Sequence, residues 1–245
     1  MALIEEFNKS GNWLFKKRSF IPVVLYVFAT IVLFIDVKES IPFFATFWWG
    51  VICIAVSMFG LLIRAFTIGF TPSGTSGRNT KKQVAENINT KGIYSIVRHP
   101  LYLGNLFMWL GIILFVGNTW FYIVGLLLFW IYYERIMFAE EMFIASKFEE
   151  YTAWADKTPA FIPSFKNWQK YDLDFSLKNV LKREYNGFFA VFISFAYINT
   201  LKHFIKKQTF EIDFFWLIAL IISFVIFVIL RTLKKKTNIL NVEGR

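Results

Sequence analysis

A polar segment gives way to an apolar helical hairpin within the stretch Gly92-Ile-Tyr-Ser-Ile-Val-Arg98-His99-Pro100-Leu-Tyr102-Leu-Gly104. Proline is tolerated in the first turn of a helix, because the N–H that it lacks would have no partner there. We therefore expect a helix to start at Pro100 and to leave free backbone N–H groups beside Arg98 and His99. Such a helix start attracts negative charge.

Apolar segments of this kind dominate the rest of the chain. Of its 245 residues, 56% are hydrophobic and 31 are phenylalanine, and its mean hydropathy of +0.50 is typical of integral membrane proteins. Several segments are shorter than the roughly 20 residues that cross a bilayer, so we expect their ends to continue as helix, especially beyond Tyr133. The segments predict an all-α, polytopic transmembrane bundle of about six spans, at 20–35, 43–63, 101–116, 119–133, 188–201 and 214–230.

The charges predict how this bundle is oriented. The net charge is +10, and most cations lie beside the ends of apolar segments, which is typical of membrane orientation rather than of nucleic-acid binding. By the positive-inside rule, both termini and the two long loops, which follow residues 63 and 133, face the cytoplasm. The segment with Lys202, Lys206 and Lys207 departs from this pattern.

The cysteine and histidine content bears on metal binding and redox chemistry. Cys53 is the only cysteine, so a disulfide within one chain is excluded. His99 and His203 are far apart in sequence, and the chain has no histidine-rich metal spacing. We therefore expect no metal centre.

Two further motifs lie after the hairpin, which turns at Gly117-Asn118. A helix that runs past residue 133 would carry Glu140 and Glu141 on neighbouring faces, where a carboxylate could bind a cationic group or pair with Arg98 or Lys157. Prolines restrict the residues before them, so the segment 157–163, with two prolines, predicts an extended strap under the bundle. Taken alone, the Glu140-Glu141 helix also fits a solvated helix beside the membrane, and the strap also fits an aromatic anchor at the membrane interface.

Together and in this order, the Arg98-His99-Pro100-x-Tyr102 element, the Glu140-Glu141 helix and the proline strap resemble the isoprenylcysteine carboxyl methyltransferase and phospholipid methyltransferase superfamily. The resemblance covers roughly 64–163. It implies a membrane enzyme that moves a methyl group from S-adenosylmethionine to a lipid or lipid-linked acceptor, with a cytoplasmic cofactor pocket. The chain then divides into N-terminal membrane helices (1–70), a cytoplasmic loop (71–97), a methyltransferase core (98–166) and a C-terminal extension with two further membrane helices (167–245).

The resemblance also implies roles for single residues. Lys157 stands where relatives carry an arginine that helps to position the substrate; lysine keeps the charge but loses the planar, two-pronged contact with a carboxylate. A second departure lies at 148–151, where the chain is one residue shorter than its relatives. The implied cofactor-binding residues are Arg98, His99, Pro100, Tyr102, Leu103, Glu140 and Glu141, and the implied catalytic residues are Arg98, Glu141 and Lys157.

We expect the acceptor to be an anionic lipid or lipid-linked group, either a carboxylate or a phosphate. Such a group is ionised at neutral pH, so the protein has chiefly to align it with the methyl group and to keep water away. The glycine- and hydroxyl-rich loop 71–82 carries Arg78, Lys81 and Lys82 and would suit a phosphorylated headgroup, although an ordinary cytosolic loop fits it equally well. An ethanolamine-lipid acceptor would also need a base to remove a proton, and Glu140, Glu141 or His99 could serve.

Two other functions fit parts of the sequence. A sterol-type membrane reductase would share the bundle and a similar Arg-His-Pro-x-Tyr element but would use NADPH; the Glu140-Glu141 helix and its strap favour the methyltransferase. A transporter or membrane scaffold would carry ionisable groups at mid-membrane or internal repeats, whereas the charged motif residues here gather at one interface. We expect neither nucleic acid nor metal as a partner, and the sequence leaves the oligomeric state open.

Overall fold

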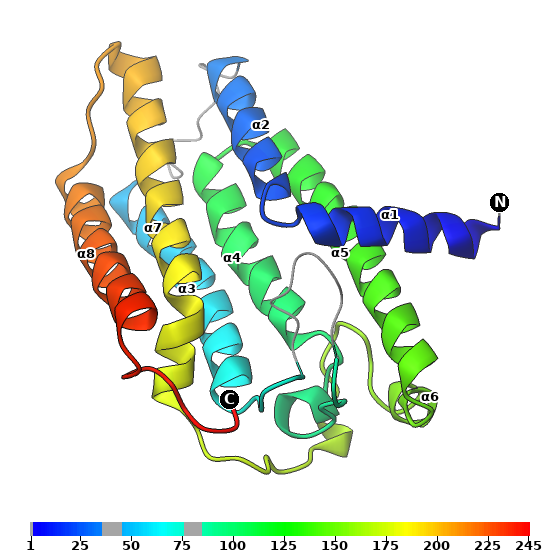
Figure 1. The fold of residues 1–245 in the computed structure, drawn as a ribbon. Coiled ribbons are helices and arrows are strands. Elements are labelled where there is room, and N and C mark those ends of the chain that lie inside the picture. The colour runs from blue at the N-terminus through cyan, green and yellow to red at the C-terminus, as the bar shows by residue number, and fades with distance from the viewer. Residues whose placement is uncertain (1, 36–45, 76–84) are drawn as a thin grey trace.

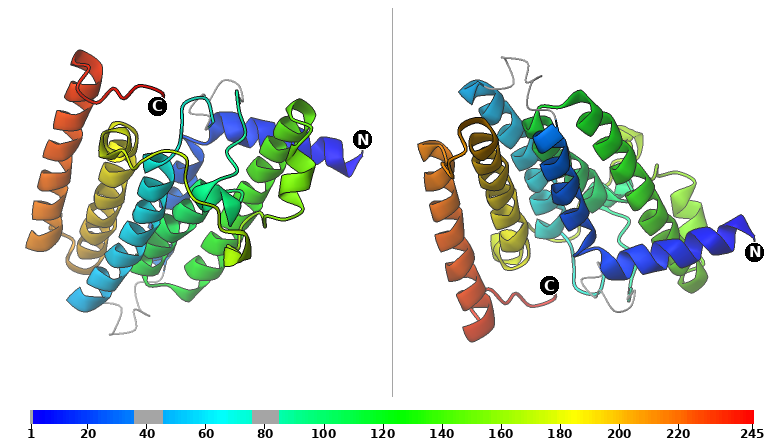
Figure 2. Two further views of the ribbon diagram at one scale, coloured as in Figure 1. Left: turned by 90° about the horizontal axis from the view of Figure 1, so that it is seen from below. Right: turned by 90° about the horizontal axis from the view of Figure 1, so that it is seen from above.

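The computed structural model describes residues 2–35, 46–75 and 85–245, and the regular elements within them are all helical (Figure 1). This confirms the predicted all-α class. The helices α8, α7, α3, α4 and α5 lie side by side as a bundle, and α1 runs across α5 (Figures 1 and 2). In chain order the α-helices are α1 (Leu3–Lys17), α2 (Ile21–Ile35), α3 (Phe47–Gly69), α4 (Pro100–Val116), α5 (Thr119–Lys147), α6 (Tyr151–Ala155), α7 (Leu177–Lys207) and α8 (Phe214–Lys236), with short 3-10 turns η2 (Gly92–Ser95) and η3 (Phe165–Asn167).

The predicted apolar segments fall largely within these helices, except that residues 43–45 lie outside the described part of the chain. By length and composition α3, α5, α7 and α8 could each cross a membrane, and α1 with α2, which meet at a bend of 82°, would make a fifth span. α4 is apolar but has only 17 residues. The structure thus contains four to five candidate spans, and the sixth stays a prediction.

The hairpin between α4 and α5 is tight, as the dipeptide Gly117-Asn118 predicts. Gly117 ends α4 with a φ of 84°, which glycine adopts without a steric penalty. The Asn118 side chain caps α5 by accepting a hydrogen bond from the backbone N–H of Phe121 at 2.7 Å. α5 then continues to Lys147, which confirms that the polar residues beyond Tyr133 are helical.

α3 and α4 pack against each other more extensively than any other pair of described helices. A Cβ added at Gly60 would lie 2.3 Å from the carbonyl oxygen of Gly104 and 2.6 Å from the backbone nitrogen of Met108. A Cβ at Gly111 would lie 2.2 Å from the hydroxyl oxygen of Ser57, which itself donates to the Met108 carbonyl at 2.9 Å. Small residues on both helices therefore let the two backbones approach closely.

Apolar clusters fill the bundle at two levels. The first surrounds the buried side chains of Ile113, Phe121 and Phe195, close to the α4–α5 hairpin. The second surrounds Phe129 and Ile136, where α1, α4 and α5 meet. Polar and charged residues that could bind a ligand or take part in a reaction gather beyond the second cluster.

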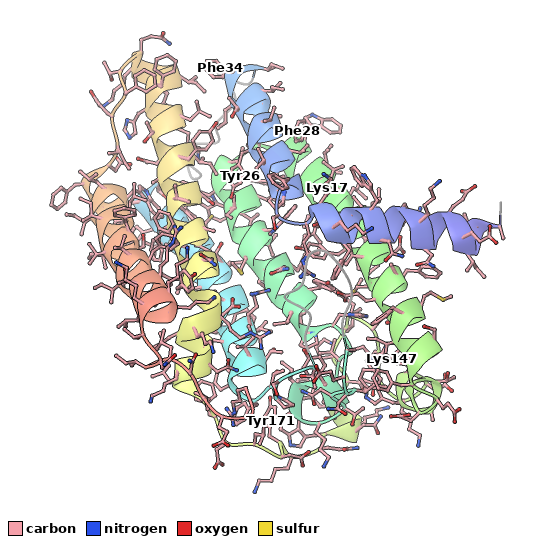
Figure 3. The ribbon with its side chains drawn as sticks, viewed as in Figure 1. Lys17, Tyr26, Phe28, Phe34, Lys147 and Tyr171 are labelled. Atoms are coloured by element: carbon pink, nitrogen blue, oxygen red, sulfur yellow. The ribbon has the colours of Figure 1, made fainter. Side chains whose placement is uncertain are left out.

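The connections that carry the predicted motifs gather at one end of the bundle. Figure 3 shows Lys147 and Tyr171 towards this end and Phe34 at the opposite end. The described parts of the loop 71–97, the segment 148–176 and the C-terminus all lie here (Figure 1). These are the segments that the charge pattern assigns to the cytoplasm, and the side of the membrane that they face stays a prediction.

Replacing Gly60 with valine should loosen the contact between α3 and α4. The nearest atoms are backbone atoms of α4, so the helices would have to move apart, and we expect the free energy of unfolding to fall by about 1–3 kcal/mol. Ala55→Val is the matched control, because Ala55 is exposed on the same helix. Unfolding midpoints in one detergent measure the difference, and equal midpoints for the two variants would contradict a close α3–α4 contact.

Candidate functional site

A cavity of about 500 Å³ opens at the end of the bundle where the connections gather. Its walls come from α3, α4, α5, α6 and α7, with η2, the end of α1 and described residues of the loop before η2. The volume lies within the range of about 300–1,000 Å³ that is usual for small-molecule sites. The space is therefore large enough for a nucleotide-sized ligand.

One wall joins the start of α4 to the second half of α5. His99 Nε2 lies 2.8 Å from Glu141 Oε1, and His99 Nδ1 lies 3.8 Å from Glu140 Oε2. The Tyr102 hydroxyl donates to Glu140 Oε1 at 2.7 Å, and its ring stacks on that of His99 at a centroid distance of 5.7 Å. Both carboxylates thus meet the start of α4, and the imidazole, which is 8% exposed, lies between them.

Arg98 reinforces the same junction. Its Nε lies 2.9 Å from Glu141 Oε1, at an angle that forms an ion pair rather than a hydrogen bond, and its Nη1 donates to the Ala155 carbonyl at 2.7 Å. Glu141 therefore faces two basic groups, Arg98 and His99, from a single helix position. Of the partners that the sequence offered for the two carboxylates, Arg98 is the one that the structure pairs with Glu141.

The proline strap lies under this junction and pairs with it through the backbone. The N–H of Arg98 donates to the Pro159 carbonyl at 2.9 Å, and the N–H of His99 donates to the Ala160 carbonyl at 3.1 Å. The strap thus supplies acceptors for these two N–H groups, and in the first turn of α4 the N–H groups of Tyr102 and Leu103 donate to the His99 carbonyl. The non-helical course of 157–163 is confirmed, and its carbonyls hold the start of α4 in place.

The short helix α6 adds two aromatic side chains to the cavity wall. Burial, with the nearby Glu141 carboxylate, raises the pKa of Tyr151 above its usual range, so its hydroxyl stays protonated at neutral pH. Trp154 also lines the cavity, and its indole Nε1 is buried with no hydrogen-bond acceptor among the described residues. A buried donor without an acceptor is unfavourable, so this N–H is suited to an acceptor brought by a ligand.

The opposite wall is organised by Arg64. Its Nε and Nη2 donate to the two carboxylate oxygens of Glu184, each at 2.8 Å, and its Nη1 donates to Asn105 Oδ1 at 2.8 Å. Asn105 in turn donates to the Tyr133 hydroxyl at 2.8 Å. This network joins α3, α4, α5 and α7. A buried ion pair is maintained only with such complete geometry, and Glu184 is only 5% exposed.

α7 brings further residues of the C-terminal extension to this wall: Arg183, Asn186 and Gly187 line the cavity beside Glu184. η2 contributes Tyr94 to the same cavity. Burial raises the pKa of Tyr94 to about 12, although the positive charge of Arg183 acts in the opposite direction. Tyr94 is therefore a neutral hydrogen-bond donor in this wall.

The structure brings together most of the residues that the sequence points to. Leu103 packs instead against the apolar cluster around Phe129, and Lys157 is exposed and does not line the cavity. Their implied roles stay predictions, as does the role of loop 71–82, since Arg78, Lys81 and Lys82 lie outside the described residues. The cavity is lined by the predicted residues Arg98, His99, Pro100, Tyr102, Glu140 and Glu141.

Sequence reasoning missed the network around Arg64. This residue follows the predicted span 43–63 directly and so has the position of a charge at the end of a span. α3 in fact continues to Gly69, which places Arg64 inside the helix, and a charge embedded in an apolar helix is a signal of function. Its partner Glu184 has no comparable signal, because it lies in a segment rich in ordinary charges.

Comparison with known proteins gives one family. Residues 45–151 match the model of the phospholipid methyltransferase family. Over 116 residues, or 47% of this chain, the sequence is 31% identical to the cobalt-zinc-cadmium resistance protein CzcN of Cupriavidus metallidurans. The aligned part is 51% of that protein, so the chain spans about half of its length. No solved structure matches the chain.

The matched residues contain α3, α4 and α5, and with them His99, Glu140 and Glu141. They end at Tyr151, where α6 begins, so α7 and α8 lie outside the match. Residues 45–151 are therefore similar to the phospholipid methyltransferase family, which lies within the superfamily of membrane methyltransferases that includes the isoprenylcysteine carboxyl methyltransferases.

Proposed function

We propose that this protein transfers a methyl group from S-adenosylmethionine to an anionic lipid or lipid-linked acceptor, within the cavity between α4, α5 and α7. The observation that carries this proposal is the convergence of His99, Glu140 and Glu141 on the cavity, in a segment that is similar to a family of membrane methyltransferases. The family match favours methyl transfer over reduction with NADPH.

The side chains at the α4–α5–α6 wall suit the polar groups of the methyl donor. A carboxylate such as Glu140 attracts its ammonium group, and Glu140 keeps one oxygen 3.8 Å from His99 rather than in a short contact. The buried indole N–H of Trp154 is a donor for its carboxylate. The Tyr102 ring, stacked on His99, gives this part of the wall an aromatic surface.

The bound donor would supply a methyl group on a positively charged sulfur, which keeps the bonding electron pair when the methyl group leaves, so that an anionic oxygen receiving the methyl group loses its charge. No proton has to move in this reaction. The residues of the cavity then have to hold the acceptor in line and exclude water. The strap helps, since its hydrogen bonds fix the backbone of Arg98 and His99.

The charges in the cavity wall favour an anionic acceptor. Among the lining residues that the structure describes, four arginines face three glutamates, so the wall is positive even with His99 neutral. The methyl donor has two positive groups, a sulfonium and an ammonium, and one negative carboxylate, so its net charge is positive like that of the wall. A negative acceptor neutralises this combination, whereas a cationic amine adds to it. The charged residues are Arg18, Arg64, Arg98, Arg183, Glu140, Glu141 and Glu184.

The proposed location is the inner face of a membrane. The positive-inside rule assigns the end of the bundle that carries the cavity to the cytoplasm, where S-adenosylmethionine is made. The apolar flanks of α3, α5, α7 and α8 would bring a lipid acceptor to the same level.

Purified protein in lipid nanodiscs tests this function in two steps. S-adenosylhomocysteine should bind in a calorimetric titration and NADPH should not. Isotope from methyl-labelled S-adenosylmethionine should then enter an acidic fraction of a total lipid extract. Binding of NADPH alone would favour the reductase, and label confined to ethanolamine lipids and their derivatives would contradict an anionic acceptor.

The change Glu140→Gln should weaken binding of S-adenosylhomocysteine without removing the hydrogen bond that Tyr102 donates. The amide keeps the shape of the side chain but loses the charge that attracts an ammonium group. A hydrogen bond to a charged group contributes about 1.5–3 kcal/mol, so the dissociation constant should rise about tenfold to a hundredfold. Glu134→Gln is the matched control on α5, because Glu134 does not line the cavity; equal losses in both variants would contradict the assignment.

The change Trp154→Phe separates ligand binding from stability. It keeps an aromatic ring and removes a buried N–H that has no acceptor in the described structure, so the melting temperature of the free protein should stay the same or rise. Affinity for S-adenosylhomocysteine should fall roughly tenfold. Trp168→Phe, at an exposed position outside the cavity lining, serves as the control. A drop in stability with unchanged affinity would show that the indole has a structural role only.

A further inference from the structure

We propose that α7 forms the acceptor half of the cavity, in which Arg183 binds the anionic group that receives the methyl group and Gly187 leaves room for its hydrocarbon chain. This inference rests on the function proposed above and assigns a part of the site that lies outside the family match. It names the acceptor as an amphiphile with an anionic oxygen next to an apolar chain.

The position of α7 separates it from the residues assigned to the methyl donor. α7 packs against α3, α4 and α8, whereas α5 packs against α1 and α4 and leads into α6 (Figures 1 and 2). The cavity lies between, with Glu140, Glu141 and Trp154 on one side and Arg183 and Gly187 on the other. A donor held at the first wall therefore leaves the α7 wall for the acceptor.

The charge that α7 presents to the cavity is that of Arg183. Glu184 is the other charged α7 residue in the lining, and both of its carboxylate oxygens accept from Arg64 at 2.8 Å. Tyr94 lies close enough to Arg183 for the positive charge to act on it; its pKa is raised by burial to about 12, so it is a neutral donor. An arginine and a phenol at one point of the wall offer hydrogen bonds to an oxyanion, and a planar guanidinium can bind a carboxylate or a phosphate through two of them.

Gly187 lies one helical turn beyond Arg183, on the same face of α7. A Cβ built there would meet only side-chain atoms at ordinary contact distances, with Leu61 Cδ1 and Met108 Cε both at 3.6 Å and Glu184 Oε2 at 3.4 Å. Within one turn the lining thus changes from a cation to a small residue, which lies next to the paired Glu184 carboxylate and to apolar side chains of α3 and α4. An anionic head with an apolar chain matches this sequence of surfaces.

The exposed position of Lys157 supports the same assignment. This lysine is the residue that the family resemblance marks for positioning the substrate, but it does not line the cavity. Arg183 provides a positive charge inside the cavity, with the planar geometry that a lysine lacks. Methylation would lower the negative charge of the acceptor by one, so Arg183 would hold the product less tightly than the acceptor, which favours release.

Titrations with simple amphiphiles test the proposal on the full-length protein in a neutral detergent, with and without S-adenosylhomocysteine. The probes are octyl phosphate and octanoate, with octanol as the uncharged reference. Wild-type protein should bind at least one anionic probe at least tenfold more tightly than octanol. Arg183→Gln should remove this preference and Arg183→Lys should restore part of it. Lys182→Gln, the neighbouring cation on α7, should leave it unchanged.

The variant Gly187→Leu tests separately whether the hydrocarbon chain of the acceptor lies beside Gly187. The added side chain should weaken all three probes by a similar factor of about tenfold or more, and Ala190→Leu, at an exposed position on the same helix, should not. Affinity for S-adenosylhomocysteine should be the same as wild type in every variant, which also shows that the proteins are folded.

An anionic preference that survives in Arg183→Gln, in protein that still binds S-adenosylhomocysteine, would overturn the assignment of Arg183. A wild-type protein that discriminates between anionic probes and octanol but does not bind S-adenosylhomocysteine would instead overturn the proposed methyl donor. Absence of any anionic preference in wild-type protein would overturn the acceptor half itself. The failures of the two proposals are thus distinguishable.

Discussion

The close approach of α3 and α4 decides where the polar groups of the cavity lie. Because position 104 has no side chain, Arg64 can cross the surface of α4: a Cβ at Gly104 would come within 2.5 Å of Arg64 Cγ. From there the guanidinium reaches Asn105 on α4 and both oxygens of Glu184 on α7. Removing one partner of a buried ion pair costs several kcal/mol, about 3–5, so this contact also fixes α7 on the core.

A second link closes the other side of the cavity, and it is built from both backbone and side chains. The strap accepts hydrogen bonds from the N–H groups of Arg98 and His99, while Glu141 on α5 faces the side chains of the same two residues. The start of α4 is therefore held from below and from the side. A helix start that carries binding groups needs such support, because the backbone N–H groups of its first turn have no acceptors within the helix.

Much of this arrangement was predictable from local rules. Pro100 marks the start of α4 because its ring fits only a first helical turn, and α5 continues past residue 133 because no breaker interrupts it before Lys147. The convergence of His99 with Glu140 and Glu141 was predictable only from the ordered set of motifs and the resemblance that it carries. A single Arg-His-Pro or Glu-Glu element has several ordinary explanations.

The remaining features of the site depend on how distant segments align with one another in the folded protein, which local rules applied to a single sequence do not give. Arg64 and Glu184 are 120 positions apart, and their pairing follows from the rotation of α7 about its own axis. The acceptors for the N–H groups of Arg98 and His99 come from a strap whose alignment with them no local rule gives. Lys157 shows the converse case: its position was carried over from a family pattern, but in this fold it is exposed and does not line the cavity.

The division of the cavity between two parts of the chain has a physical consequence. In the proposed function, a positive methyl donor at the α5 wall and Arg183 at the α7 wall would repel each other across the same low-dielectric space. An anionic acceptor between them turns that repulsion into two attractions, so each ligand should favour the binding of the other, and such coupling is reciprocal. The α5 wall comes from the family segment, whereas α7 does not. Under this proposal, a change in α7 could alter the choice of acceptor and leave the hydrogen bonds of His99, Glu140 and Glu141 as they are.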